Sequence, residues 1–138
     1  MNAYAHSTYK KQSVNTMTPI EVIVKIYDEC ERQLNRAIKF IDDKKFDKAH
    51  DALDRAGELV NGLRSVLDMS AGEIATNLDS LYEFFFKQIV AADMKKDVEL
   101  IKQILPQVSE LKDTFTQLSR MPRDGIPYSG SIMTGASG

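Results

Sequence analysis

The sequence lacks the residue patterns on which most enzyme chemistry depends. It contains two histidines, His6 and His50, and one cysteine, Cys30, so it can form neither an internal disulfide nor a zinc site of the usual Cys/His spacing. Glycine-rich phosphate-binding motifs, the HExxH zinc motif and the GxSxG nucleophile motif are also absent. We therefore expect a protein that is not an enzyme and that uses no cofactor or metal.

The chain also has no excess of positive charge and no long apolar run. Its 18 basic and 20 acidic residues give a formal net charge of -2, which creates no broad positive field for nucleic acid or anionic lipid. The longest apolar stretches, residues 20–27 and 84–92, contain charged side chains and fall well short of the ~20 residues of a membrane span. The N-terminus does not resemble a secretory signal. We expect a cytoplasmic protein with no nucleic-acid partner and no membrane insertion.

Strong helix breakers are scarce in the middle of the chain. Two of the four prolines and four of the seven glycines follow residue 118. No segment alternates apolar and polar residues in the way that a half-buried strand does. We therefore expect one all-α domain, a four-helix bundle over residues 18–118, between a flexible N-terminal arm (1–17) and a flexible C-terminal tail (119–138).

Local signals mark the helix boundaries. Thr18 and Glu21 form a capping box around a proline at the first helical position, and Ser70 and Glu73 are spaced for a second box. Pro106 is expected to kink the last helix or to split it. Short connectors favour an antiparallel up-down-up-down arrangement. The predicted helices span about residues 18–42, 46–68, 70–93 and 98–118.

Each predicted helix carries an apolar stripe at steps of three and four residues, the spacing of one helix face. Cys30 lies on the stripe of the first helix and is expected to be a small buried hydrophobe rather than a reactive thiol. The stripe of the third helix predicts a core seam of Ile74, Leu78, Leu81, Phe85, Gln88 and Ala92.

Several helices carry a second apolar stripe beside the first. Four aromatic residues also fall within positions 82–86, too many for all of them to face one core. These extra residues either widen the core or form exposed grooves, and a contiguous exposed apolar patch usually has a partner. We favour the grooves. The second stripes consist of Val22, Ile26, Ala52, Leu59, Val66, Tyr82, Phe86 and Ile89.

Several segments, in this order and spacing, resemble one known family. They are YKKQSVNT (9–16), TPIEVIVKIYD (18–28), RAGELVNGL (55–63) and GEIATNLDSLY (72–82), followed by a turn at 91–93. The chain is similar to the FliS-type flagellar export chaperones, although Phe115 stands where that family is expected to have tryptophan. The resemblance implies a cytoplasmic helical bundle that binds the disordered C-terminal region of flagellin, prevents premature polymerisation and presents the cargo to a component of the flagellar export gate.

The grooves and the aromatic residues of the N-terminal arm together give the expected partner-binding residues. In the free protein the arm is expected to fold over a groove and to be displaced by cargo, unless it is an inert tail with incidental tyrosines. The partner-binding residues that we predict are Tyr4, Tyr9, Val14, Val22, Ile26, Tyr27, Leu59, Val66, Leu78, Tyr82, Phe86 and Ile89.

Other functions remain open on the same architecture. A generic helical-bundle adaptor would also need exposed apolar stripes, and a weak homodimer could form through the same surface. A phosphorelay through His50 is disfavoured, because Asp51 and Asp54 would repel a phosphoryl group. The paired carboxylates at 42–43 are expected on a solvated face, without the Glu-x-x-His spacing of di-iron bundles.

Overall fold

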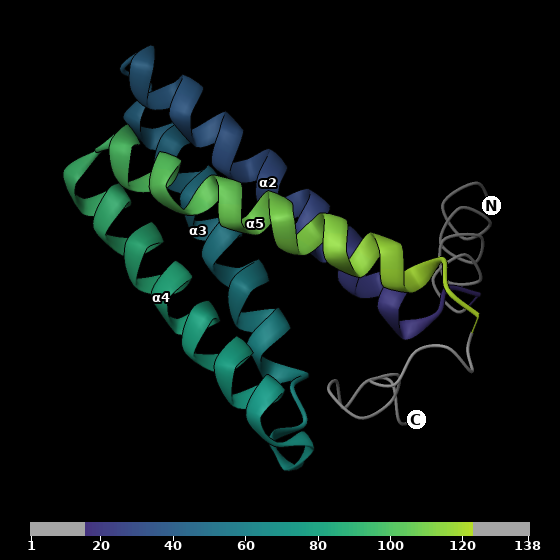
Figure 1. Cartoon of the computed structure of the whole chain (residues 1–138). Coiled ribbons are helices and arrows are strands. Elements are labelled where there is room, and N and C mark those ends of the chain that lie inside the picture. The colour runs from purple at the N-terminus through teal and green to yellow at the C-terminus, as the bar shows by residue number, and fades with distance from the viewer. Residues whose placement is uncertain (1–15, 123–138) are drawn as a thin grey trace, which may run out of the picture.

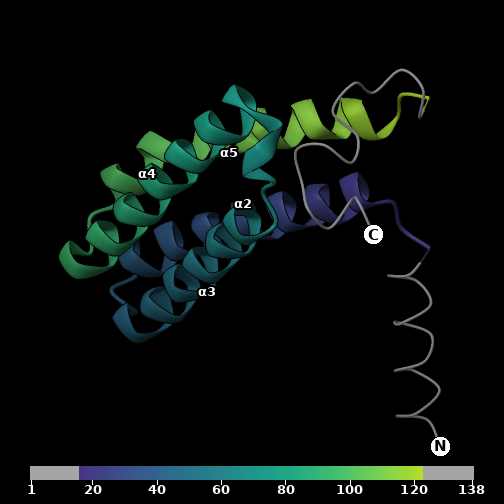
Figure 2. The ribbon, with the colours of Figure 1, turned by 90° about the horizontal axis from the view of Figure 1, so that it is seen from below.

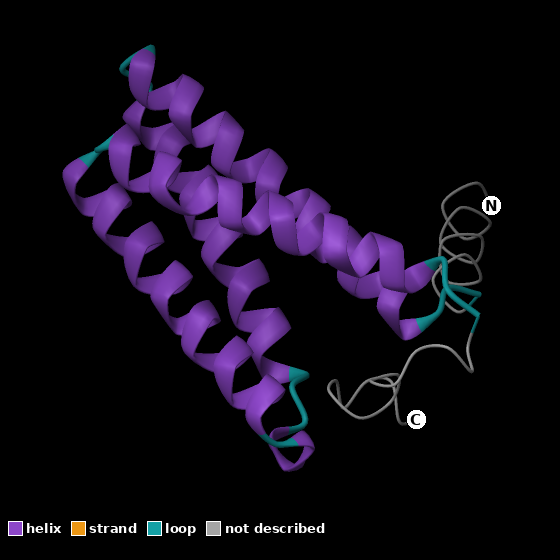
Figure 3. Ribbon diagram, in the orientation of Figure 1, coloured by secondary structure: helices purple, strands orange, loops and turns teal. Residues whose placement is uncertain are grey.

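The computed structural model describes residues 16–122 and consists of helices and turns. The helices are α2 (Pro19–Asp42), α3 (Phe46–Ser65), α4 (Glu73–Lys95) and α5 (Val98–Ser119), with a short 3-10 turn, η1 (Met69–Ala71), before α4. No strand occurs among these described residues, as Figure 3 shows. The all-α four-helix bundle predicted from the sequence is therefore confirmed.

Consecutive helices run in opposite directions and pack as two layers (Figures 1 and 2). α2 packs most extensively against α3 and α5, and α4 contacts α3 more than it contacts α5. Toward one end the α2–α5 pair and the α3–α4 pair diverge, so the start of α2 and the end of α5 extend together away from α4 (Figure 1). The side chain of Glu31 links α2 to α5, because it accepts hydrogen bonds from Ser109 Oγ and, at 2.8 Å, from Lys112 Nζ.

The first predicted helix start is confirmed in its main feature. Thr18 Oγ1 accepts a hydrogen bond from the amide of Glu21 at 3.2 Å, and Pro19 is the first helical residue. The return bond differs from the expectation, since the Glu21 carboxylate accepts from the Thr18 hydroxyl at 3.1 Å and not from its amide. The carboxylate still lies in the first turn, where the helix dipole favours negative charge.

The second predicted capping box is wrong. Ser70 does not cap α4, because its amide and hydroxyl both donate to Asp68 Oδ1, which caps η1. Gly72 precedes α4 with a φ of 88° and without any side-chain cap, and this backbone conformation favours glycine. The turn also shortens the preceding helix, so α3 ends at Ser65 rather than near Asp68.

Pro106 does not split the last helix. α5 continues through it without a break from Val98 to Ser119. Proline leaves the carbonyl of residue 102 without its helical donor, but Lys102 and Pro106 are both exposed, so water can solvate that carbonyl. The alternative of two separate helices is therefore wrong, and the expected bend near Pro106 stays a prediction.

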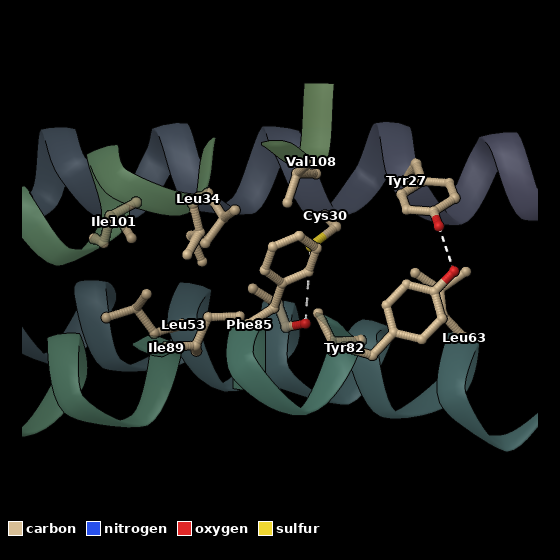
Figure 4. Close-up of a cluster of buried hydrophobic side chains, with 14 of the residues drawn as sticks. Tyr27, Cys30, Leu34, Leu53, Leu63, Tyr82, Phe85, Ile89, Ile101 and Val108 are labelled. Atoms are coloured by element: carbon tan, nitrogen blue, oxygen red, sulfur yellow. Dashed lines mark hydrogen bonds between the residues drawn. The ribbon is translucent and has the colours of Figure 1, made fainter. Parts of the chain in front are cut away.

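The core contains a pair of tyrosines that join α2 to α4. The hydroxyl groups of Tyr27 and Tyr82 are hydrogen-bonded to each other (Figure 4). The Tyr27 ring also stacks on Phe115, with ring centroids 5.4 Å apart. Burial raises the pKa of Tyr82 to about 12 and that of Tyr27 further, so both hydroxyls stay neutral at physiological pH. Phe115 is buried, so an aromatic ring does occupy this core position.

The core seam of α4 is displaced from the predicted one. Ile74 is exposed and Leu78 and Leu81 are only half-buried, whereas Tyr82 and Ile89 belong to the core. Tyrosine is accommodated there because Tyr27 satisfies its hydroxyl. The residues of α4 that are buried are Ala75, Tyr82, Phe85, Ile89 and Ala92.

Cys30 is buried, as predicted. It lies in the core between α2 and α3, with its sulfur 4.0 Å from the carbonyl oxygen of Ala56. Burial raises the pKa of its thiol to about 12, so the thiolate is scarce at neutral pH.

Candidate functional site

The structure divides the predicted partner-binding residues into three groups. Tyr4, Tyr9 and Val14 lie outside the described residues. Tyr27, Tyr82 and Ile89 were expected on the binding surface, but they are almost fully buried. Their placement on an exposed surface is therefore corrected, because their side chains fill the space between the helices. The remaining predicted residues are half-buried, and they are Val22, Ile26, Leu59, Val66, Leu78 and Phe86.

Phe86 lines a groove between α3 and α4, together with the nearly buried Ile89. We call it the α3–α4 groove. It is open to solvent. Val90 and Met94 lie on its α4 side and are 41% and 81% exposed. The lining residues are Leu53, Asp54, Gly57, Glu58, Asn61, Phe86, Ile89, Val90, Asp93 and Met94.

The volume of the α3–α4 groove is about 240 Å³, too small for a large cofactor but sufficient for a few apolar side chains of a partner. Gly57 makes this space available. A Cβ atom at this position would lie 3.3 Å from Phe86 Cε2 and 3.9 Å from Ile89 Cγ2. The distance to Phe86 is shorter than most contacts that Cβ atoms make in proteins. Because glycine has no side chain, the Phe86 ring packs directly against the backbone of α3, and the ring forms part of the groove wall.

Acidic side chains surround the apolar part of the groove. Asp54, Glu58 and Asp93 all line it. Asp54 forms no ion pair within residues 16–122, and Glu58 pairs with the exposed Arg55 at 3.4 Å. The groove is therefore suited to an apolar segment whose flanking residues are basic.

Polar contacts link α3 to α4 at both ends of the groove. At one end, Asp93 Oδ2 lies 2.6 Å from His50 Nδ1, and the other oxygen of Asp93 pairs with Lys96. At the other end, Arg64 Nε donates to Asp79 Oδ1 at 2.6 Å and Arg64 Nη2 donates to Asp79 Oδ2 at 3.3 Å. These contacts fix the spacing of the two helices along the groove.

The His50 end of the groove is expected to respond to pH. The hydrogen bond and the charge of Asp93 raise the pKa of His50 above its ordinary value of 6.5, against the smaller effects of desolvation and of the Lys96 charge. Burial would raise the pKa of Asp93, but Lys96 and His50 together lower it, so Asp93 stays ionised when His50 titrates. Because the pKa of His50 is higher in the folded protein than in the unfolded chain, protonated His50 stabilises the fold. This contribution is complete below the unfolded-state pKa and is lost as the pH rises through the folded-state pKa.

His50→Gln is therefore expected to lower the melting temperature at about pH 5.5 and to have little effect above about pH 8.5. Thermal unfolding of both proteins followed by circular dichroism at the two pH values measures this. The same deficit at both pH values would mean that the charge of His50 does not contribute.

The sequence interpretation missed Gly57, Val90 and Met94. The signal was present, since Phe86, Val90 and Met94 are spaced four residues apart and therefore lie on one face of α4. Gly57 is cited from the sequence only as part of the segment at residues 55–63, because its importance depends on the ring of Phe86, which lies on another helix. Phe84 is exposed and Phe86 half-buried, so the expectation that the aromatic cluster cannot all face the core is confirmed.

The structure also bears on metal binding, membrane insertion and phosphoryl transfer. No group of three potential ligands among residues 16–122 could hold a metal ion. Within the same range, no helix is both long and apolar enough to cross a membrane. The ring of His50 is exposed, and its Nδ1 atom is engaged by Asp93, which would have to be displaced before a phosphoryl group could bind there.

Comparison with known proteins identifies the family. The sequence model described as "FliS: Flagellar protein FliS" matches residues 1–122. The chain belongs to the FliS family. The resemblance found in the sequence segments is thereby confirmed.

Two relatives in the FliS family match along most of their length. The flagellar secretion chaperone FliS of Bacillus subtilis (strain 168) is 23% identical over 127 residues, which cover 92% of this chain and 95% of that protein. The flagellar secretion chaperone FliS of Salmonella typhimurium (strain LT2) is 28% identical over 121 residues, covering 86% of this chain and 89% of that protein. Both relatives are named as chaperones rather than as enzymes.

A solved structure has the same fold. It is described as the crystal structure of a flagellar chaperone from bacteria, and it matches with a TM-score of 0.68 over 85% of this chain and 96% of that one. Its sequence is 19% identical, so this likeness concerns the fold alone.

Proposed function

We propose that this FliS-family chain is a cytoplasmic export chaperone for flagellin. The α3–α4 groove carries the proposal, because it offers the exposed side chains of Val90 and Met94 beside the ring of Phe86. In this proposal the disordered C-terminal region of flagellin binds in the groove. Binding covers a segment that would otherwise associate with other flagellin copies, until a component of the flagellar export gate receives the cargo.

The energetics of the groove suit a segment that folds on binding. A disordered chain loses conformational entropy when it is ordered, so apolar burial must offset that loss. Each large apolar side chain that becomes fully buried contributes about 1.5–3 kcal/mol, and a few such anchors suffice for a short amphipathic helix. The acidic residues Asp54, Glu58 and Asp93 favour a cargo helix with lysine or arginine beside its apolar face.

The other predicted residues extend this proposal beyond the groove. Val22, Ile26, Leu59, Val66 and Leu78 are half-buried and are proposed as further contacts for the extended parts of the cargo. The arm with Tyr4, Tyr9 and Val14 is proposed to cover apolar surface until cargo displaces it. A weak homodimer through the same surface would compete with cargo, and sedimentation velocity with and without flagellin measures that competition.

Calorimetric titration with the flagellin of the same genome tests the function. We expect one-to-one binding of full-length flagellin and no detectable binding of flagellin that lacks its C-terminal region. A second titration, with residues 1–15 of the chaperone deleted, is expected to give tighter binding if the arm competes with cargo. Equal binding of intact and truncated flagellin would overturn the proposed cargo segment, and equal binding of unrelated amphipathic helices would favour a generic adaptor.

A further inference from the structure

The surface between α2 and α3 carries a second hollow, separate from the α3–α4 groove. Its volume is about 460 Å³, and it is open to solvent. No residue lines both this hollow and the α3–α4 groove. We call it the α2–α3 hollow, and it is lined by Gln33, Arg36, Phe40, Lys48, Asp51, Ala52 and Arg55.

Two cations in the hollow are held against one aromatic ring. Arg36 Cζ lies 5.5 Å and Lys48 Nζ lies 5.9 Å from the centroid of the Phe40 ring, one from each helix. Within residues 16–122, neither cation forms an ion pair. One turn before Arg36, by contrast, Arg32 pairs with Glu29 at 3.2 Å. The positive charge of the hollow is therefore concentrated around Phe40.

The remaining charges leave the hollow with a positive balance. Arg55 adds a third cation, which pairs with Glu58 at 3.4 Å. Asp51 is the single carboxylate among the lining residues, so the lining carries three positive charges against one negative charge. A hollow with this balance attracts carboxylates more strongly than the chain's net charge of -2 would suggest.

The hollow continues into apolar surface along the same helix faces. Steps of three and four residues lead from Gln33 back to Ile26 and Val22 on α2, and from Ala52 on to Leu59 on α3 and to Val66, which directly follows α3. These four apolar residues are all half-buried. A chain that runs along the two helices would therefore meet apolar side chains first and cations near Phe40.

We propose that the α2–α3 hollow binds an acidic peptide segment of a partner protein. Guanidinium groups bind carboxylates through parallel N–H donors, and a ring beneath the guanidinium leaves those edge donors free. Lys48 supplies a second charge from the facing helix, and an apolar side chain next to the acidic residues packs on Phe40. The neighbouring carboxylate of Asp51 opposes this binding. The proposal does not depend on flagellin as the cargo of the α3–α4 groove.

Fluorescence anisotropy tests the proposal. The probe is a labelled synthetic peptide in which glutamates flank a single tryptophan. We expect the peptide to bind the full-length chain, to bind more weakly as salt rises, and to lose about tenfold or more in affinity with Arg36→Glu/Lys48→Glu. Asp51→Asn is expected to tighten binding severalfold, an effect that simple damage to the fold would not produce. Lys25→Glu/Lys95→Glu is the matched control, because it changes the net charge equally at exposed positions outside the hollow.

Several outcomes would overturn the proposal. One is that a peptide with glutamine in place of glutamate binds as tightly as the acidic peptide. Another is that Arg36→Glu/Lys48→Glu and the control Lys25→Glu/Lys95→Glu lose the same affinity for the acidic peptide. A third is that Asp51→Asn binds the acidic peptide more weakly than the unaltered chain does. Tighter binding of a single-stranded RNA of the same charge would assign the hollow to nucleic acid instead. Flagellin binding measured on the same variants keeps this test apart from that of the proposed function, since the α3–α4 groove is unchanged in them.

Discussion

Replacing Val90 and Met94 together by glutamine is expected to weaken flagellin binding about a hundredfold without unfolding the protein. The two side chains are 41% and 81% exposed, so the free chain loses little packing when they change. In the proposed complex their apolar surface is buried, and about 1.4 kcal/mol lost at each position amounts to a hundredfold. Glutamine is a good helix former and adds no charge to the acidic groove. Isothermal titration with flagellin measures the change.

The control for this variant is Lys102→Gln/Thr114→Gln, which places glutamine at two exposed positions of α5 outside the groove. It is expected to bind flagellin as the unaltered chain does. Thermal unfolding of both variants shows whether the fold is intact. Unchanged flagellin affinity in Val90→Gln/Met94→Gln would remove the α3–α4 groove from the binding surface.

Tyr82→Ala is expected to lower the free energy of unfolding by about 3–5 kcal/mol, a large part of the stability of a domain of this size. The reason is that Tyr82 is fully buried and its loss leaves a cavity between α2 and α4. Phe84→Ala is the matched control on the same helix, because Phe84 is 43% exposed, and it is expected to cost about 1 kcal/mol or less. Urea unfolding measures both. Equal losses would place Tyr82 on the surface after all.

The hydroxyl pair gives a second test of the same core. Tyr82→Phe is expected to cost about 1–3 kcal/mol, because it leaves the Tyr27 hydroxyl buried without its partner. Tyr27→Phe/Tyr82→Phe is expected to cost less than the sum of the single variants, since neither unpaired hydroxyl remains. Additive losses would mean that the two hydroxyls do not depend on each other.

The fold could be predicted where local and long-range signals agree. Thr18 and Pro19 mark the start of α2 by chemistry within one turn, and the apolar stripe of that helix points to one side. The signals disagree at the start of α4. Ser70 fits a capping box by spacing, but Asp68 competes for its amide and Gly72 permits a turn that the spacing does not encode.

The binding surface was harder to predict, because burial depends on residues from other helices. In the sequence Tyr82 is one aromatic residue more than a single core stripe needs, and its burial depends on a hydroxyl contributed by Tyr27, 55 positions away. Phe86 was correctly expected near the surface. The space beside it depends on Gly57 of the facing helix, and no periodicity within α4 indicates that contact.

The burial of Cys30 has a practical consequence for these experiments. It is the only cysteine of the chain, it is 1% exposed, and the raised pKa of its thiol keeps it protonated near neutral pH. Maleimide dyes react with thiolates, so the native protein should take up almost no label. A cysteine introduced by Met94→Cys would then be the single reactive site, and a fluorophore there would report on the occupancy of the α3–α4 groove in real time.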